Sequence, residues 1–572
     1  MARSIFRRLH RRYGTPASLA RRLLAPRPGI DPLTPGAGAP PEAAPESPVD
    51  RIAAAFERLD AVKPFSGKTV AVIGGGFAGL SAAYAACRGG AYVTLYEATP
   101  YVGGRVQSDH DGIAAGRIVE RGAELIGTIH PVWLYYARLF GLGMVSIDDE
   151  TYLDAVGIDP DYVLDGAAVP KDRLEDLYAD FDAIQAVVYA TARDVDSNAP
   201  WTTRPDLDGV SFRDWLVAAM QDEPQLRYPR SLDLFLAEIE NDNVLPAAEQ
   251  STLAVLAQVA AGGEVDGRPL FFTDVELFRC AEGNHALADR LLAALRDQRM
   301  EIMTGMPIGK IVVPAAASAR VDLYGYVNYV FGTSYWGTPN PHDYVVFAAP
   351  TVLNGGNHVV AFRDDGDGPH PFDMPATRAG NAVKLHVRRS ARFWLDEGRE
   401  PNGTCFVTGA AASPVGQTWE ATSNQALLAP GAGDPVVLSV FTGSLGATAA
   451  IAHAGAIEAF YTPMLDALAP GWATGATVFY SQINTVYQAQ NVAQAFFPGY
   501  SCPSPGQVTT AMKALNAVVA GKLAYAGEQA SPGFYGYMEG ALASGLNAVL
   551  RLGGLTTATA VDEASAAAVA KA

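Results

Sequence analysis

The chain of 572 residues is longer than a single ordinary domain, so we expect two or three lobes. Its formal net charge of −18 at pH 7 argues against a nucleic-acid partner, because phosphate binding requires a basic field over the protein surface. Four scattered cysteines without a C-x-x-C pair indicate a reducing compartment, and we expect a cytoplasmic protein.

The first 30 residues differ from the rest of the chain, because they carry eight arginines and no acidic residue. The pairs Arg7-Arg8 and Arg11-Arg12 suggest export by the twin-arginine route, but no apolar stretch of sufficient length follows them. We therefore favour a basic arm followed by a Pro/Ala-rich linker. Weak contact of this arm with an anionic membrane surface and a solvated tail both stay open.

The stretch from Thr69 to Glu97 has the pattern of a dinucleotide-binding unit. It predicts a buried strand, a helix and a second strand, at 69–73, 77–88 and 92–96. The turn between the first strand and the helix has the spacing G-x-G-x-x-G, formed by Gly74, Gly76 and Gly79. Such glycines let the backbone approach a pyrophosphate at the helix N-terminus, and the acid after the second strand can accept ribose hydroxyls.

A second glycine pair with an arginine follows at 103–105 and suits a longer cofactor than NAD. Gly104 would let the chain pass close to the ligand, and the planar fork of Arg105 can pair with a phosphate. From Glu97 to Arg105 the sequence resembles the flavin-dependent amine oxidase family, which includes monoamine, polyamine and L-amino-acid oxidases. The resemblance implies that FAD is the cofactor.

The resemblance covers most of residues 68–552 and implies an α/β fold (α+β overall). A Rossmann-like FAD-binding domain would be interrupted by a mixed substrate-binding domain, as in amine oxidases. The expected segments are an N-terminal arm (1–50), FAD-binding parts (51–144, 276–355, 501–552), substrate-binding parts (145–275, 356–500) and a flexible tail (553–572). Helices are expected at 247–260 and from about Ala447, the second after a strand at 436–441 and a turn.

In the resembled family, the segment G-A-E-L at 122–125 packs beside the flavin and opens toward the substrate. Many L-amino-acid oxidases have an arginine at the position of Leu125, where it binds the substrate carboxylate. Because that guanidinium is absent here, another residue must bind a carboxylate if the substrate is an amino acid. Glu124 is a candidate to face an ammonium group, although an acid near a loop is more often solvated or ion-paired.

Two further positions follow from the resemblance. Ile308 would meet the adenine through its backbone. Lys384, upstream of an R-F-W triplet, would lie by the flavin N5 and hold a water that takes part in oxygen activation. The alternative for Lys384 is a surface lysine on an edge strand.

Near the C-terminal end, a strand that leads to Gly527 and Glu528 is followed by a loop and a helix that begins near Met538. This presents a second helix N-terminus to the cofactor. The resemblance places Glu528 at the ribityl or phosphate portion of FAD. It places Gly536 and Tyr537, of the G-Y-M-E-G-A pattern, at the substrate.

The chain departs from its relatives in two ways. Pro498, not Cys502, stands where monoamine oxidases attach FAD, so we predict noncovalent FAD. The tryptophan usual in that approach is also missing, and Tyr487, Phe496, Phe497 or Tyr500 is expected to replace it.

The expected activity is oxidative deamination of an L-amino acid to a 2-oxo acid, ammonia and H2O2, with hydride transfer to flavin N5 and reoxidation by O2. A primary amine or polyamine oxidase, an amino-acid 2-monooxygenase and a non-enzymatic flavin-binding scaffold are the alternatives. We expect a homodimer and no metal. Histidines 285 and 386 are expected to be structural rather than catalytic bases.

Overall fold

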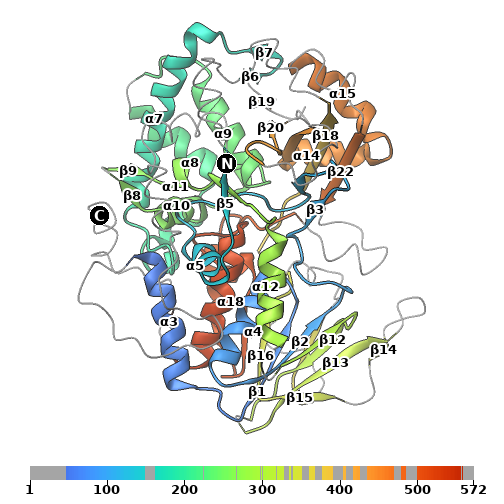
Figure 1. Ribbon diagram of the computed structural model, residues 1–572. Helices are drawn as coiled ribbons and strands as arrows, with labels where there is room; N and C mark the ends of the chain where they lie inside the picture. The colour runs from blue at the N-terminus through green and yellow to red at the C-terminus, as the bar shows by residue number, and fades with distance from the viewer. Residues whose placement is uncertain are drawn as a thin grey trace.

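The computed structural model describes the chain from residue 47 to residue 557, with gaps at 148–160, 223–224, 266, 297, 299, 317, 328–333, 336–338, 351–359, 367–376, 391–402, 407–415, 426–434, 469–477, 485–498 and 556. The described residues form two lobes, one built on a parallel sheet and one that combines a second large sheet with a group of helices (Figure 1). Residues 1–46 of the predicted N-terminal arm (1–50), and with them its proposed membrane contact, lie outside the described residues.

The first lobe contains a six-stranded sheet whose first five strands run parallel. Its order is β11 (Met300–Thr304), β2 (Tyr92–Glu97), β1 (Thr69–Ile73), β16 (Tyr344–Phe347), β24 (Leu523–Tyr525) and the antiparallel β23 (Val518–Val519). The central strands β1, β16 and β24 are short and mostly buried, as expected for parallel strands that are covered on both faces. Segments far apart in the sequence therefore meet in one sheet, as the interrupted Rossmann-like domain requires.

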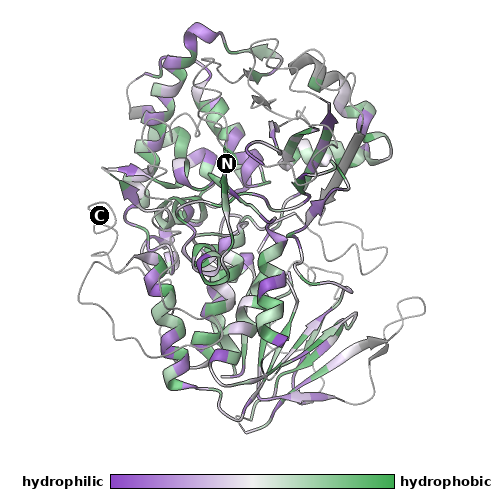
Figure 2. Cartoon of the chain, viewed as in Figure 1, coloured by the Kyte–Doolittle hydropathy of each residue, from purple (hydrophilic) through white to green (hydrophobic). Residues whose placement is uncertain are grey.

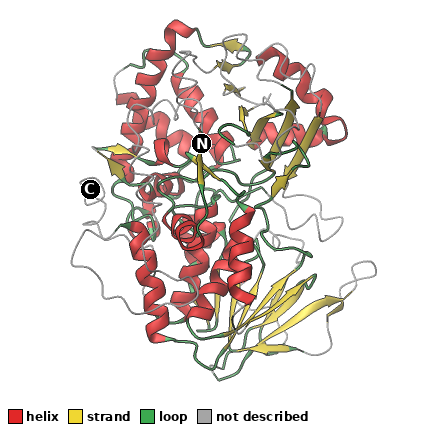
Figure 3. Ribbon diagram, viewed as in Figure 1, coloured by secondary structure: helices red, strands yellow, loops and turns green. Residues whose placement is uncertain are grey.

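Five helices cover one face of this sheet (Figure 3). They are α3 (Pro48–Val62), α4 (Phe77–Arg88), α5 (Pro131–Phe140), α12 (His285–Arg296) and α18 (Met538–Leu552). Helices α4 and α18 approach closely at Gly545, where a side chain would not fit: a Cβ there would lie 2.2 Å from the carbonyl oxygen of Ala78. In Figure 2 hydrophobic residues follow the strands and hydrophilic residues mark the outward turns of α3 and α12.

A smaller sheet covers the opposite face of the parallel sheet. It contains β12 (Ile308–Val312), β13 (Val321–Val327), β14 (Ser334–Tyr335), β15 (Asn340–His342) and β17 (Ala361–Arg363). The two-residue period of β1 explains the two cores: Val70 and Val72 pack with the helices, whereas Ala71 and Ile73 pack with the smaller sheet.

The second lobe has a seven-stranded sheet. Its order is β22 (Val478–Asn484), β18 (Ala382–Arg389), β21 (Val436–Gly443), β20 (Gly416–Glu420), β19 (Gly403–Phe406), β6 (Asp161–Leu164) and β7 (Ala167–Ala168). Helices α14 (Ser444–Ala452) and α15 (Ile457–Leu468) pack on this sheet. A separate helical core is formed by α7 (Leu174–Ala192), α8 (Phe212–Ala219), α9 (Ser231–Asp242), α10 (Thr252–Ala261) and α11 (Phe271–Asp274).

Short hairpins and turns connect these parts. The hairpins are β3 (Ser108–His110) with β4 (Ile118–Glu120) and β8 (Glu264–Val265) with β9 (Arg268–Pro269). In addition, β5 (Met144–Ser146) pairs with the distant β10 (Phe278–Cys280), and a short helix, α17 (Lys513–Leu515), precedes β23. Among the described helices, none combines the length and apolar character that a membrane crossing requires. The predicted domain boundaries and homodimer stay predictions.

Two predicted elements are wrong in their bounds. The helix expected at 247–260 is divided, because Gln250 is extended and Ser251 caps the start of α10, its side chain accepting the N–H of Ala254. The turn expected before the helix near Ala447 is absent, since β21 reaches Gly443 and α14 begins at Ser444.

Candidate active site

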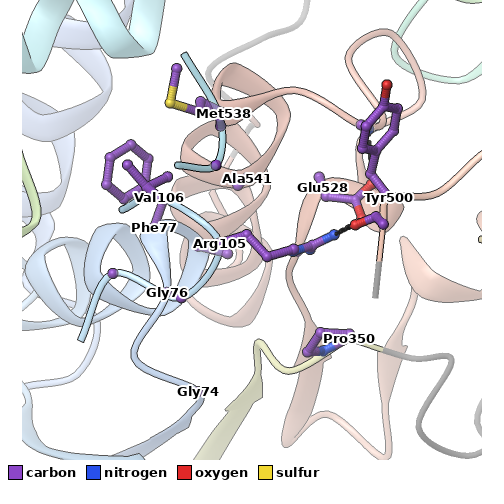
Figure 4. A pocket seen from close by; sticks show the side chains of 18 of the residues that line it. Gly74, Gly76, Phe77, Arg105, Val106, Pro350, Tyr500, Glu528, Met538 and Ala541 are labelled. Carbon is purple, nitrogen blue, oxygen red and sulfur yellow. Dashed lines mark hydrogen bonds and ion pairs between the residues drawn. The ribbon is translucent and has the colours of Figure 1, made fainter. Parts of the chain in front are cut away.

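A cavity extends from the glycine-rich turn of the first lobe to the sheet and helices of the second lobe. Figure 4 shows the part of its wall where Gly76, Arg105 and Glu528 lie, with Tyr500 beyond them. All the predicted cofactor and substrate residues except Gly79 line it: Gly74, Gly76, Glu97, Gly104, Arg105, Glu124, Leu125, Ile308, Lys384, Gly527, Glu528, Gly536 and Tyr537.

The glycine-rich turn leaves room for a ligand at the start of α4. Gly74 has a φ of +107°, and its N–H donates to the carbonyl of Tyr96 at 2.8 Å. A Cβ at Gly79 would lie 1.8 Å from the carbonyl oxygen of Gly74, so this position packs the helix against the strand. A Cβ at Gly76 would find no atom nearer than Gly104 Cα at 3.9 Å and would instead enter the cavity. The turn therefore fits a pyrophosphate that accepts the backbone N–H groups at the helix N-terminus.

The carboxylate of Glu97 is fixed at the end of β2. Its Oε2 accepts the N–H of Gly75 at 2.6 Å, and its Oε1 accepts the N–H and the hydroxyl of Thr99, both at 2.8 Å. Each carboxylate oxygen has lone pairs beyond these bonds. Glu97 is therefore oriented at the cavity as a ribose acceptor should be.

Arg105 and Glu528 form an ion pair in the cavity wall. Arg105 Nη1 lies 2.9 Å from Glu528 Oε1 and also donates to the carbonyl of Gly499 at 2.8 Å. Glu528 further accepts the N–H of Gly536 at 2.8 Å and the hydroxyl of Ser501 at 3.1 Å. The pair joins the FAD-side turn to the C-terminal segment. Glycines, an oriented acid and a fixed arginine together fit the diphosphate and ribose of FAD.

Lys384 is buried on β18, not exposed on an edge strand. Its ammonium lies 2.6 Å from Glu124 Oε2 and donates to the carbonyls of Glu120 at 2.7 Å and Gly122 at 3.0 Å. The Lys384 side chain therefore points to the buried face of β18, where the Glu124 carboxylate of the other lobe compensates its charge.

Glu124 is the centre of a buried polar cluster that reaches the cavity. Besides Lys384 it accepts the indole N–H of Trp419 at 3.2 Å and a guanidinium N–H of Arg279 at 3.5 Å. The ammonium that Glu124 contacts in the structure is thus that of Lys384. Burial raises the pKa of the neighbouring Glu120 carboxyl to about 7 and lowers the pKa of Arg279.

Aromatic side chains from both lobes line the cavity, among them Tyr500, Tyr537 and Phe441. Tyr537 caps α18, and its ring centre lies 5.7 Å from that of His130 and 6.2 Å from that of Phe271. Tyr500 stacks on Phe441 with ring centres 6.4 Å apart. Of the four aromatic replacements proposed from the sequence, Tyr500 lines the cavity, and Tyr487, Phe496 and Phe497 lie outside the described residues.

Several cavity residues were not predicted from the sequence. They are Asp242, Asn243, Glu276, Gln417, Trp419, Phe441 and Tyr535. Trp419 lies on β20 and not in the segment before the C-terminal element, where the sequence has no tryptophan. In the strand Gly416–Glu420 all five residues are buried, and no local sequence signal tells that this strand reaches a cavity.

The prediction of noncovalent FAD depends on residues 498 and 502. Pro498 lies outside the described residues. Cys502 is fully buried in the helical core and is not among the cavity residues, so its position agrees with that prediction. Burial also raises the pKa of its thiol, which disfavours the reactive thiolate.

Comparison with known proteins agrees with a flavin-binding cavity. The family model for flavin containing amine oxidoreductases matches residues 77–552. A flavin-containing monoamine oxidase, AofH, of Mycobacterium tuberculosis is 26% identical over 341 residues, which are 58% of this chain and 66% of that protein. The chain thus matches slightly under two thirds of the length of this relative. An L-amino-acid oxidase of Echis ocellatus is 38% identical over 84 residues, 15% of this chain and 16% of that protein.

Solved structures share the fold. A putrescine oxidase bound to putrescine is 17% identical with a TM-score of 0.63, covering 85% of this chain and 98% of its own. Cyclohexylamine oxidase from Brevibacterium oxydans is 20% identical with a TM-score of 0.64, covering 85% and 99%. At these identities the likeness establishes the two-lobed α/β architecture.

Proposed function

The chain belongs to the flavin containing amine oxidoreductase family, and we propose that it uses FAD to oxidise an amine that arrives as a cation. When bound, FAD would supply a hydride acceptor for the α C–H bond of the amine, so that the C–N bond becomes a C=N bond, and O2 would take up the two electrons. The chain's own residues must select the amine, orient it and limit the access of water.

The observation that carries this proposal is the charge of the cavity wall beyond the glycine-rich turn. Two carboxylates, Asp242 and Glu276, line the cavity there together with Tyr537. The cationic side chains of the wall, Arg105, Arg121 and Lys384, each contact a carboxylate of the protein. An ammonium group is therefore the favoured charge for the ligand at this end.

The aromatic residues supply the second part of amine recognition. Tyr500 and Tyr537 present ring surface next to the carboxylates, and such surface attracts both alkyl groups and cations. We assign Tyr537 to substrate alignment. We assign Lys384, held by Glu124, to the oxygen chemistry beside the flavin through its positive charge, because its three N–H groups already donate to protein acceptors. The structural relatives that act on putrescine and cyclohexylamine agree with an amine as the substrate class.

Oxidation of an L-amino acid, the activity first expected from the sequence, is the second candidate. The 38% identity with an L-amino-acid oxidase over 84 residues favours it. A carboxylate ligand would have to bind without a guanidinium at Leu125, in a cavity to which Asp242 and Glu276 add negative charge. We therefore rank it below an amine.

Peroxide release by the FAD-loaded protein across primary amines, diamines and L-amino acids tests the proposal. We expect turnover of amines and none of amino acids, and Glu276→Gln should raise the apparent KM for a cationic amine. Turnover of amino acids alone would overturn the amine proposal, and carbon dioxide release would indicate the monooxygenase. Bound FAD that no compound reduces would indicate the scaffold.

A further inference from the structure

A second cavity borders α18 on a different face from the cavity of the candidate active site. Its volume is about 390 Å³, and α3, the end of α10 and α18 contribute to its wall (Figure 1). On α18 the lining residues Glu539, Ala543, Asn547 and Arg551 recur every four residues and therefore form one stripe. Among the described residues, the two cavities have no lining residue in common. A volume of this size is within the range of small-molecule sites.

Arg551 is the residue of this wall that points to a ligand. Its Nη1 donates to Asn516 Oδ1 at 3.1 Å, whereas its Nε and Nη2 are buried and have no hydrogen-bond partner. No carboxylate of the described residues forms an ion pair with it. Its place in the last turn of α18 suits a positive charge but supplies no acceptor for these N–H groups. A buried donor without an acceptor costs free energy, which a bound anion would offset.

The two unpartnered atoms form one edge of the guanidinium. Nε and Nη2 carry parallel N–H bonds that match the two oxygens of a carboxylate. The chain uses the same edge elsewhere, since Arg204 donates from Nε to Asp206 Oδ1 at 3.1 Å and from Nη2 to Asp206 Oδ2 at 3.0 Å. We propose that Arg551 binds the carboxylate of an aryl or alkyl monocarboxylic acid in the second cavity through these two bonds.

The rest of the wall favours an apolar body with a single negative charge. Large apolar side chains line the cavity, namely those of Ile52, Ile129, Trp201, Leu270 and Phe534. They can bury an alkyl chain or an aromatic ring. The charged residues of the wall besides Arg551 are Arg51, Glu264 and Glu539. Because these include more acids than bases, they do not favour a second negative charge on the ligand.

The test is a calorimetric titration of the FAD-loaded protein with hydrocinnamate and with its neutral amide, hydrocinnamamide. We expect one hydrocinnamate per chain and binding of the amide that is at least about tenfold weaker, because the amide lacks the charge that Arg551 pairs with. Arg551→Met should weaken hydrocinnamate binding by at least about tenfold and leave the affinity for the amide unchanged. Arg296→Met is the matched control and should bind like the wild type, since Arg296 also lies in the last turn of a helix but is exposed.

Thermal melts separate a ligand-binding arginine from a structural one. Without ligand, Arg551→Met should melt at the temperature of the wild type or above it, because the change removes an unpaired buried charge. Saturating hydrocinnamate should raise the Tm of the wild type and not that of the variant. Trp201→Phe should abolish the change in tryptophan fluorescence that hydrocinnamate causes, because Trp201 lines the same cavity.

Four results would overturn the proposal. They are equal affinities of the wild type for the acid and the amide, equal affinities of the wild type and Arg551→Met for the acid, tighter binding of inorganic phosphate, and a shift of the flavin spectrum that an amine reverses. The last result would place the acid in the cavity of the candidate active site. The comparison of acid and amide uses the wild type alone, so it decides the matter even if Arg551→Met does not fold. None of these measurements depends on amine turnover, and their outcome is therefore independent of the proposed function.

Discussion

Replacing Lys384 by methionine tests the buried cluster that joins the two lobes. The side chains of Lys384 and Glu124 are 8% and 3% exposed, and their charged atoms lie 2.6 Å apart. Removing one partner of a buried pair costs about 3–5 kcal/mol, because the other charge is left buried. Arg279 and Trp419 still donate to Glu124, so we expect a loss near the lower end, about 3 kcal/mol.

Urea unfolding of the FAD-loaded protein measures this loss. With an m-value of about 3 kcal/mol/M, the midpoint should fall by about 1 M. The double variant Lys384→Met/Glu124→Gln removes both charges and should be more stable than the sum of the single losses predicts. Lys68→Met is the matched control, since its side chain is 50% exposed and lies 3.8 Å from Asp343. A midpoint for Lys384→Met equal to that of this control would refute the reasoning.

Five other outcomes are expected. Gly76→Ala should fold but bind FAD at least tenfold more weakly in a titration, whereas Gly79→Ala should unfold at a lower temperature because its Cβ meets the preceding turn at 1.8 Å. Burial raises the pKa of the Glu120 carboxyl to about 7 in the folded protein, whereas in the unfolded chain this carboxyl loses its proton near pH 4.3. Between these pH values the unfolded chain gives up a proton that the folded protein keeps. The free energy of unfolding should therefore fall as the pH rises, by up to about 1.4 kcal/mol per pH unit. Thermal melts from pH 5 to pH 7 should therefore show a smaller decline in Glu120→Gln, and an equal decline would contradict the assignment. Lys384→Met should retain FAD and slow reoxidation by O2 in stopped flow, and an unchanged rate would remove its assigned role. Acid precipitation should release all FAD into the supernatant, and yellow pellets would indicate a covalent bond.

The cofactor end of the cavity was predictable because its determinants are local. Gly74, Gly76 and Gly79 lie within six residues, and Glu97 follows at the end of the next strand. Strand, turn and helix dictate where these positions lie relative to one another, so their pattern implies their geometry.

The substrate end was less predictable because its contacts join distant segments. Glu124 meets Lys384 across 260 positions and Trp419 across 295. Asp242 ends a helix in a segment with no motif, and only the packing of α9 against the sheet brings it to the cavity. Periodicity does not encode such long-range contacts, which is why the family resemblance was informative about FAD and less so about the substrate.

The most direct test of the account is an anaerobic titration of the purified, FAD-loaded protein with a primary amine, followed by the yellow flavin absorbance. The account predicts that one equivalent of amine bleaches one equivalent of FAD, and that air restores the colour with release of peroxide. A chain that takes up no FAD, or whose bound FAD keeps its colour with every amine, would contradict it.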